Sequence, residues 1–168
     1  MHTRTHIGVA LLAAIALSAC GKSPGERMAE AAIEASTGQD AQVDADGDKV
    51  TFKTDKGDMT ITGGDAAVMP ATFPKDVWLP SGYKVASSME MPGALVVEVQ
   101  APGTVQGLAA DAGKAMLAQG WKQRVSMQQS AETHIVVYEK DRRDASLTLN
   151  ADPDSKGVRL GVQVTTKQ

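Results

Sequence analysis

Hydrophobic and polar residues alternate one by one over three short segments between residues 41 and 62. A repeat of two residues is typical of a β-strand with one buried face. Asp46-Gly47 lies between the first and second segments and Asp55-Lys56-Gly57 between the second and third, so each break has the glycine that hairpin turns use. The pattern predicts a three-stranded meander, with its apolar positions at Val43, Val50, Phe52, Met59 and Ile61.

A helix is predicted just before this meander, over residues 24–37. Ser23 and Glu26 have the spacing of a capping box, and Pro24 suits the first helical position. Gly38 is a natural left-handed stop. The apolar stripe of this helix is modest, with Ile33 and several alanines. Because so small a unit buries little apolar surface, we expect it to need a second surface to pack on.

The alternation stops over residues 63–82, which we call the strap. Three prolines recur there, Pro70, Pro74 and Pro80, and each disfavours helix in the residue before it. An extended connector is therefore predicted. The strap is also rich in large apolar side chains, so we expect it to be ordered and packed on the rest of the protein. These side chains are Phe73, Val77, Trp78 and Leu79.

Residues 83–168 return to alternation with one interruption. Alternating stretches on either side of Pro92-Gly93 predict a hairpin. Thr104 can cap a helix over 104–119 that Gly120 can end. One face of that helix is apolar, with Leu108, Ala112, Ala115 and Met116. Four further segments then alternate at strand length, with apolar positions starting at Trp121, Ile135, Leu147 and Val158.

These elements predict an α+β fold. An N-terminal helix and a three-stranded antiparallel meander are followed by the strap and by a ββαββββ antiparallel sheet with one helix on a face. The expected divisions are residues 1–19 as a leader, 20–62 as helix plus meander, 63–82 as an ordered connector and 83–168 as the antiparallel α+β domain.

An apolar run from Ile7 to Leu17 precedes all of these elements. It follows the basic Arg4, has the length of a signal peptide and is too short to span a bilayer comfortably. The sequence Leu17-Ser18-Ala19-Cys20 resembles the lipobox of bacterial lipoprotein precursors. That resemblance implies a diacylglyceryl thioether on Cys20, cleavage just before it and, because Gly21 follows instead of aspartate, sorting to the outer membrane. The alternatives are an uncleaved transmembrane anchor and an ordinary signal peptide.

Charge and composition narrow the range of functions. The formal net charge is −3, and loss of residues 1–19 would remove Arg4 but no acidic residue. Mild acidity argues against nucleic acid and anionic lipid headgroups as partners. His134 is the only histidine after the leader and Cys20 the only cysteine, which argues against a transition-metal site of the His/Cys type. We therefore expect no metal and no cofactor.

The chain as a whole resembles a group of uncharacterised lipoproteins of the Gram-negative bacterial envelope. Beside the lipobox, the likeness rests on the acidic stretch D-x-D-G-D-x-V-T at 44–51, on Phe73-Pro74-Lys75-Asp76-Val77 ahead of a Gly82 turn, and on Gly120-Trp121 before a strand meander. The resemblance implies a lipid anchor and an envelope location, and it implies no activity.

Two features invite a catalytic or metal-binding interpretation. Asp44, Asp46 and Asp48 alternate like the first ligands of an EF-hand loop, but Lys49 occupies the position that needs glycine and Asp55 the position that needs glutamate. We interpret the stretch as a hairpin turn with solvated carboxylates, the alternative being a weak surface cation site. His134 could serve a hydrolase, but no nucleophile-elbow, zinc-protease or phosphate-loop motif accompanies it.

The strap is the best sequence candidate for a recognition site. Extended proline-rich backbone with aromatic side chains is a common docking element, which makes Phe73, Val77 and Trp78 candidate partner-docking residues. The alternative is that these side chains hold the two parts of the protein together. We favour this structural role, because a protein with 4% aromatic residues seldom leaves them exposed.

The sequence therefore predicts a non-catalytic lipoprotein of the cell envelope. Its body would act as an interaction or assembly module facing the periplasm, held to the outer membrane by lipidated Cys20, with an envelope protein as a candidate partner. The alternative is a lipoprotein that binds a small apolar ligand between the helix at 104–119 and the sheet. A lined cavity of several hundred Å³ would favour that alternative, and a filled interior would favour the first.

Overall fold

The structure of the protein, a computed structural model, describes residues 22–44 and 48–167. The described residues form two helices, a short 3-10 turn and nine strands, so the α+β class is confirmed. The elements of the first half are α1 (Pro24–Thr37), β1 (Ala41–Val43), β2 (Lys49–Thr54), β3 (Gly57–Gly63) and the 3-10 turn Gly64–Ala66. Those of the second half are β4 (Lys84–Met91), β5 (Ala94–Pro102), α2 (Val105–Ala118), β6 (Lys122–Gln128), β7 (Thr133–Lys140), β8 (Arg143–Ala151) and β9 (Gly157–Thr166).

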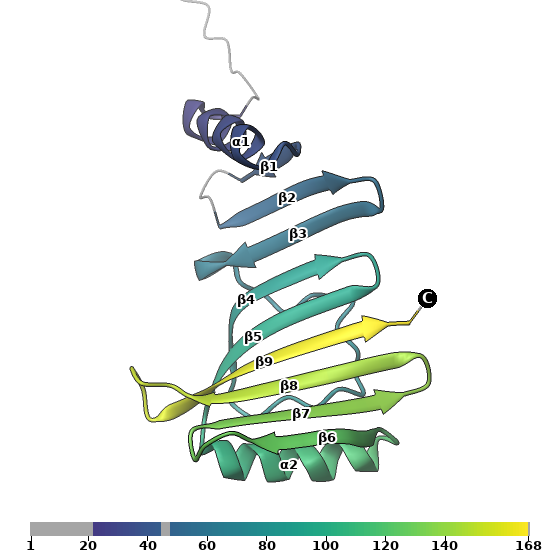
Figure 1. The fold of residues 1–168 in the computed structure, drawn as a ribbon. Coiled ribbons are helices and arrows are strands. Elements are labelled where there is room, and N and C mark those ends of the chain that lie inside the picture. The colour runs from purple at the N-terminus through teal and green to yellow at the C-terminus, as the bar shows by residue number, and fades with distance from the viewer. Residues whose placement is uncertain (1–21, 45–47, 168) are drawn as a thin grey trace, which may run out of the picture.

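All nine described strands belong to one antiparallel sheet. Their order is β1-β2-β3-β4-β5-β9-β8-β7-β6, with α1 at the β1 end and α2 at the β6 end (Figure 1). Short turns join β2 to β3, β4 to β5, β6 to β7, β7 to β8 and β8 to β9, whereas two other connections are longer. The strap joins β3 to β4. The connection through α2 carries the chain from β5 to β6 at the far edge, and the meander from β6 to β9 then returns to pair β9 with β5.

The predicted boundaries of both helices hold closely. In α1 the Ser23 hydroxyl accepts a hydrogen bond from the backbone N–H of Glu26, and the Glu26 carboxylate accepts one from the N–H of Ser23, which completes the capping box. Gly38 ends the helix with φ of 70°, where a side chain would be strained. In α2 the Thr104 hydroxyl accepts from the N–H of Gly107 at 3.1 Å.

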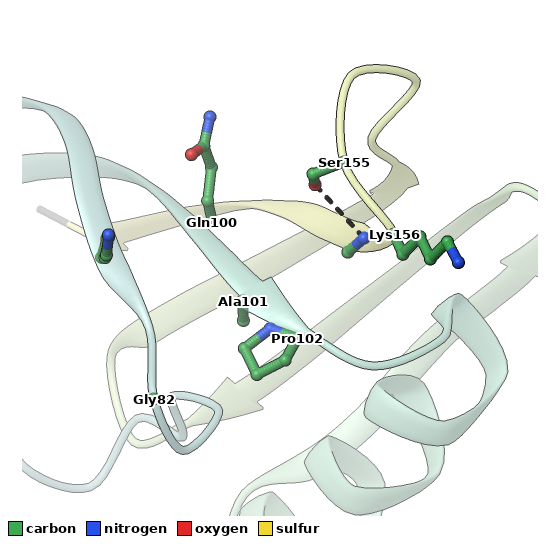
Figure 2. A pocket seen from close by; sticks show the side chains of 8 residues that line it. Gly82, Gln100, Ala101, Pro102, Ser155 and Lys156 are labelled. Carbon is green, nitrogen blue, oxygen red and sulfur yellow. Dashed lines mark hydrogen bonds between the residues drawn. The ribbon is translucent and has the colours of Figure 1, made fainter.

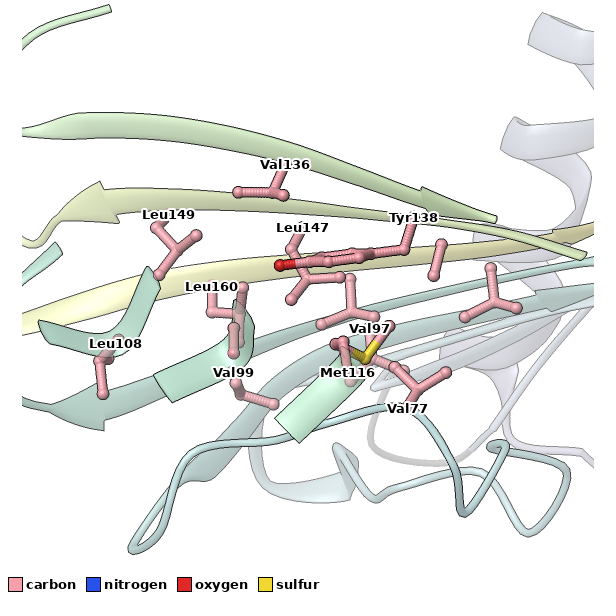
Figure 3. Packing of buried hydrophobic residues seen from close by; sticks show 14 of the residues in the cluster. Val77, Val97, Val99, Leu108, Met116, Val136, Tyr138, Leu147, Leu149 and Leu160 are labelled. Atoms are coloured by element: carbon pink, nitrogen blue, oxygen red, sulfur yellow. The ribbon is translucent and has the colours of Figure 1, made fainter. Parts of the chain in front are cut away.

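The hydrophobic core lies on one side of the sheet only, which we call the core face. Leu95, Val97 and Val99 of β5 point to this side with alternate residues of β9, β8 and β7. The buried stripe of α2 covers them, and the strap covers the neighbouring part of the same face. Figure 3 shows Met116 of α2 and Val77 of the strap meeting Val97 and Val99 in this layer. The helix predicted to lie on one face of the sheet is thus confirmed.

The prediction of a separate three-stranded meander beside a second sheet is corrected by the structure. β3 pairs directly with β4, with Ile61 opposite Met89, so the meander extends the larger sheet. This pairing provides the second surface that the small N-terminal unit needs. The hydroxyls of Thr62 and Ser88, both buried, lie 2.7 Å apart across the junction.

Among the described residues, no helix combines the length and the apolar character that crossing a membrane requires.

Candidate functional site

The strap residues singled out from the sequence lie against the core. Val77 is buried, and Phe73 and Trp78 are half-buried with one side packed on the core cluster. Two tight turns shape the strap. In them the backbone N–H of Phe73 donates to the carbonyl of Pro70, and that of Val77 donates to the carbonyl of Pro74. The backbone N–H of Trp78 also points at the Met116 sulfur of α2, 3.3 Å away. This placement agrees with the structural role and leaves docking by these residues a prediction.

Asp76, which the sequence reasoning did not select, fastens the strap to the sheet. Its carboxylate accepts two hydrogen bonds from Arg143 of β8, at 2.9 and 2.7 Å, and one from Lys140 of β7 at 2.7 Å. Its backbone carbonyl accepts from the indole N–H of Trp121 at 2.7 Å. The Arg143 hydrogen bonds, with support from Lys140, hold the pKa of the Asp76 carboxyl far below its usual range.

Arg143 contributes to the same cluster in a second way. The centre of its guanidinium lies 5.0 Å from the centroid of the Trp121 ring, within the range of a cation–π contact. The carboxylate of Asp76 raises the pKa of Arg143. Each charged group of this cluster has a partner of opposite charge. The cluster therefore holds the strap on the sheet and leaves no unpaired charged group for catalysis. The sequence around Asp76 does not indicate this ion pair, because Arg143 lies far away along the chain.

His134 and Ser126 form the nearest approach to a catalytic pair. They lie on β7 and β6, and the Ser126 Oγ is 2.9 Å from the His134 Nε2. A hydrolytic triad also needs a group that orients the histidine. No carboxylate within residues 22–44 and 48–167 hydrogen-bonds to this ring, and Ser126 is exposed on an edge strand. The pair therefore has the form of a cross-strand hydrogen bond.

The hairpin turn predicted at 44–48 lies partly outside the described residues, and of its aspartates only Asp44 and Asp48 are described. The Asp44 carboxylate accepts from the backbone N–H of Lys49 at 3.1 Å, and the Asp48 carbonyl accepts from the N–H of Gly63 at 2.8 Å. Asp46 lies outside the described residues, as does Cys20. Within the described part of the chain, no three His, Cys, Asp or Glu side chains come together in a way that could hold a metal ion.

A surface hollow of about 310 Å³ lies between β4, β5 and the turn before β9. Its polar side chains are Lys84, Gln100, Ser155 and Lys156, and the Ser155 hydroxyl accepts a hydrogen bond from the N–H of Gly157. Figure 2 shows the Lys156 side chain extending away from Gln100, so these two side chains do not point toward a common position. A binding site needs polar groups aimed at a common ligand, and this hollow lacks that arrangement.

The side of the sheet opposite the core face carries apolar side chains that the core does not use. Directly opposed residues of antiparallel strands point to the same side, so the register defines which residues form a row. One row crosses five strands through Val43, Val50, Ile61, Met89 and Val96. A second consists of Ala41, Phe52 and Met59 on β1–β3 and of Met91 and Ala94 on β4–β5. We call these ten residues the apolar rows.

The apolar rows arise because the buried side of the sheet changes along its width. In β5 the apolar core residues point to the core face, whereas in β2 and β3 the same face carries Thr51, Thr60 and Thr62. The apolar residues of β2 and β3 consequently point the other way. Val43 beside α1 is 8% exposed, and the other nine residues of the rows are half-buried. Neither α2 nor the strap reaches this side of the sheet.

Polar residues bound the apolar rows on the sheet. Val96 of β5 pairs with Gln163 of β9, and Ala94 pairs with Thr165. Ser146 and Thr148 of β8 continue this polar surface. A smaller apolar group reappears at the far edge, where Val125 and Met127 are 44% and 48% exposed. The alternation in the sequence revealed each apolar residue, but it could not reveal that two parts of one sheet turn opposite sides inward.

The two edges of the sheet differ. At the β1 edge, the Glu30 carboxylate of α1 accepts a hydrogen bond from the backbone N–H of Val43 at 2.9 Å, so α1 covers this edge. At the other edge, every residue of β6 is exposed. β6 also has a register shift between Gln123 and Val125 and carries Lys122 and Arg124. A bulge and basic side chains are typical of edge strands that avoid pairing with other chains.

No family model matches this chain, and the searches of curated proteins and of solved structures found no match.

Proposed function

We propose that this chain is a non-catalytic lipoprotein of the Gram-negative envelope. A lipid on Cys20 anchors it in the outer membrane, and its body works on the periplasmic side as an interaction or assembly module. The observation that carries the proposal is the set of apolar rows on the uncovered side of the sheet. The largest apolar patch on a monomer is often a functional surface.

The packing under α2 favours an interaction module. It argues against the alternative, in which a small apolar ligand binds between this helix and the sheet. Met116, Trp121 and Tyr138 fill that space and are between 0% and 1% exposed. The hollows at this end of the molecule lie at its surface, for example beside the N-terminus of α2. A ligand would have to displace well-packed side chains in order to enter the interior.

The chemistry of the polar clusters supports a non-catalytic role. Lowered carboxyl pKa values occur at Asp76, Asp152 and Glu139, and in each case the main cause is a hydrogen bond to a neighbouring side chain that also fixes a loop or strand end. Asp152, for example, accepts from Ser155 of its own turn at 2.8 Å and from Arg159 of β9 at 3.1 Å. These carboxylates accept hydrogen bonds that stabilise the fold.

The anchor is tested by metabolic labelling with a clickable palmitate analogue. We expect the full chain to be labelled and to float with outer-membrane fragments, and we expect Cys20→Ser to lose both properties. Ser23→Ala is the matched control, since it removes a helix cap near Cys20 but leaves the lipobox intact. Label that persists in Cys20→Ser, or is lost in Ser23→Ala as well, contradicts the proposed anchor.

A further inference from the structure

The apolar rows contain no charged residue and span five strands of the sheet. Strands lie roughly 4.8 Å apart, and successive residues on one side of a strand lie about 7 Å apart, so the rows form a strip of a few hundred Å². A stable dimer needs about 800 Å² from each partner. The strip is thus small for a permanent protein interface, but it is broad enough to rest on the boundary between lipid headgroups and acyl chains.

A shared carboxylate places the N-terminal end of the described chain beside this strip. One oxygen of Glu30 accepts from the Lys22 ammonium at 2.6 Å and from the backbone N–H of Val43 at 2.9 Å. The Lys22 hydrogen bond is the main reason that the pKa of Glu30 is lowered. The Lys22 ammonium therefore lies at the edge of β1, and Val43 is the first residue of the row that runs through Val50, Ile61, Met89 and Val96.

The anchor has little freedom to move away from this point. Cys20 stands two residues before Lys22, and an extended chain spans at most roughly 3.6 Å per residue. Acyl chains attached at Cys20 would thus enter the bilayer within a short distance of the β1 edge. The strip begins at this β1 edge, where Val43 contacts Glu30.

We propose that the occupant of the apolar rows is the bilayer surface itself, so that the uncovered side of β2–β5 lies on the membrane beside the anchor. This inference rests on the proposed function, because the lipid on Cys20 brings the strip to the membrane. Phe52 and Met59, which face each other across β2 and β3, enter the interface. Lys53 and Asp58, also opposed but on the other side of these strands, point toward the periplasm.

Site-specific fluorescence on the lipidated full chain tests this arrangement. Lipidation consumes the only cysteine, so one introduced cysteine is the only free thiol for an environment-sensitive dye. Met59→Cys and Phe52→Cys report on the apolar side, and Asp58→Cys and Lys53→Cys are their matched controls one residue away. Each labelled protein is placed in vesicles of zwitterionic phospholipid with and without brominated acyl chains. Using two pairs keeps the test valid if one variant does not fold.

The expected result is a blue shift and bromine quenching for dyes at positions 59 and 52, with neither effect at 58 and 53. If the protein floats with the vesicles but dyes at 59 and 52 have the same emission wavelength and quenching as dyes at 58 and 53, the proposed membrane contact is wrong and the anchor still holds. A blue shift at 59 in detergent-free solution without lipid shows that a second copy covers the strip and also overturns it. Failure of the unmodified chain to acquire lipid and to float overturns the proposed function together with this inference.

Discussion

The carboxylate of Asp76 and the guanidinium of Arg143 form a two-pronged ion pair across the contact between strap and sheet, with N–O distances of 2.9 and 2.7 Å. The side chains are 22% and 26% exposed, so solvent screens this pair less than a surface pair. The pair ties the middle of a twenty-residue connector to β8, and the indole of Trp121 binds the backbone at the same residue. We therefore expect Asp76 to decide whether the strap stays on the core.

Asp76→Asn should lower the free energy of unfolding by about 2 kcal/mol, because it weakens the hydrogen bonds to Arg143 and leaves the cations of Arg143 and Lys140 without a counter-charge. Urea denaturation followed by tryptophan fluorescence measures the loss. Asp144→Asn is the matched control, since Asp144 pairs with Lys167 on the surface at 3.2 Å and should cost less than about 1 kcal/mol. Equal effects from the two variants would show that the Asp76 pair does not hold the strap.

The same carboxyl predicts how stability depends on pH. The folded pKa of Asp76 lies below its usual 3.8, so the folded state binds this proton less readily than the unfolded state. The stabilisation is therefore complete above the unfolded pKa and is lost as the pH falls from there toward the folded pKa. We expect the stability difference between the unchanged protein and Asp76→Asn to shrink below about pH 4. A difference that stays constant through acidification would assign the effect to packing.

Local signals in the sequence were enough to predict the helices and strands. The features that the sequence did not predict depend on residues far apart in the chain. The capping box at Ser23 and Glu26 and the stop at Gly38 fixed α1, because caps depend on residues a few positions apart. The pairing of β3 with β4 joins Ile61 to Met89 across the whole strap, and no local pattern encodes that distance. The Asp76–Arg143 pair was missed for the same reason.

The apolar rows, too, could be predicted from the sequence only in part. Alternation identified Val50, Phe52, Met59 and Ile61 as apolar strand positions, and one buried side was the natural assumption. Which side of a shared sheet they take depends on the register with β4, where Ser88 faces Val97 of the core and Met89 faces away. A shift of one residue would turn every side chain to the opposite side. The apolar rows are thus a property of register.

Tyr138→Phe should leave stability unchanged or raise it by about 1 kcal/mol, because the buried phenol oxygen has no hydrogen-bond partner and its desolvation is uncompensated. Figure 3 shows this oxygen among aliphatic side chains near Leu147 and Leu160, and burial raises the pKa of the phenol. Tyr83→Phe at a position 37% exposed serves as the control and should have no effect. A marked loss of stability in Tyr138→Phe would indicate a buried water that bonds to the hydroxyl.

His134→Ala should change the free energy of unfolding by no more than about 1 kcal/mol, as expected for a half-buried strand residue that has one cross-strand hydrogen bond. Ser126→Ala should behave in the same way. A fluorophosphonate probe, which labels activated serines, should not react with the unchanged protein. Labelling that disappears in both variants while the fold persists would restore the hydrolase interpretation.

Trp78 separates the two interpretations of the strap. Its ring is half-buried on the core cluster and its backbone N–H contacts the Met116 sulfur, so Trp78→Ala removes part of a large packed surface. Full burial of such a ring is worth about 3–5 kcal/mol, and partial burial should give about 2 kcal/mol. Val68→Ala, at a strap position 62% exposed, is the control and should cost less than about 0.5 kcal/mol. Thermal unfolding measures both, and an unchanged melting temperature in Trp78→Ala would contradict the structural role and make Trp78 a docking residue.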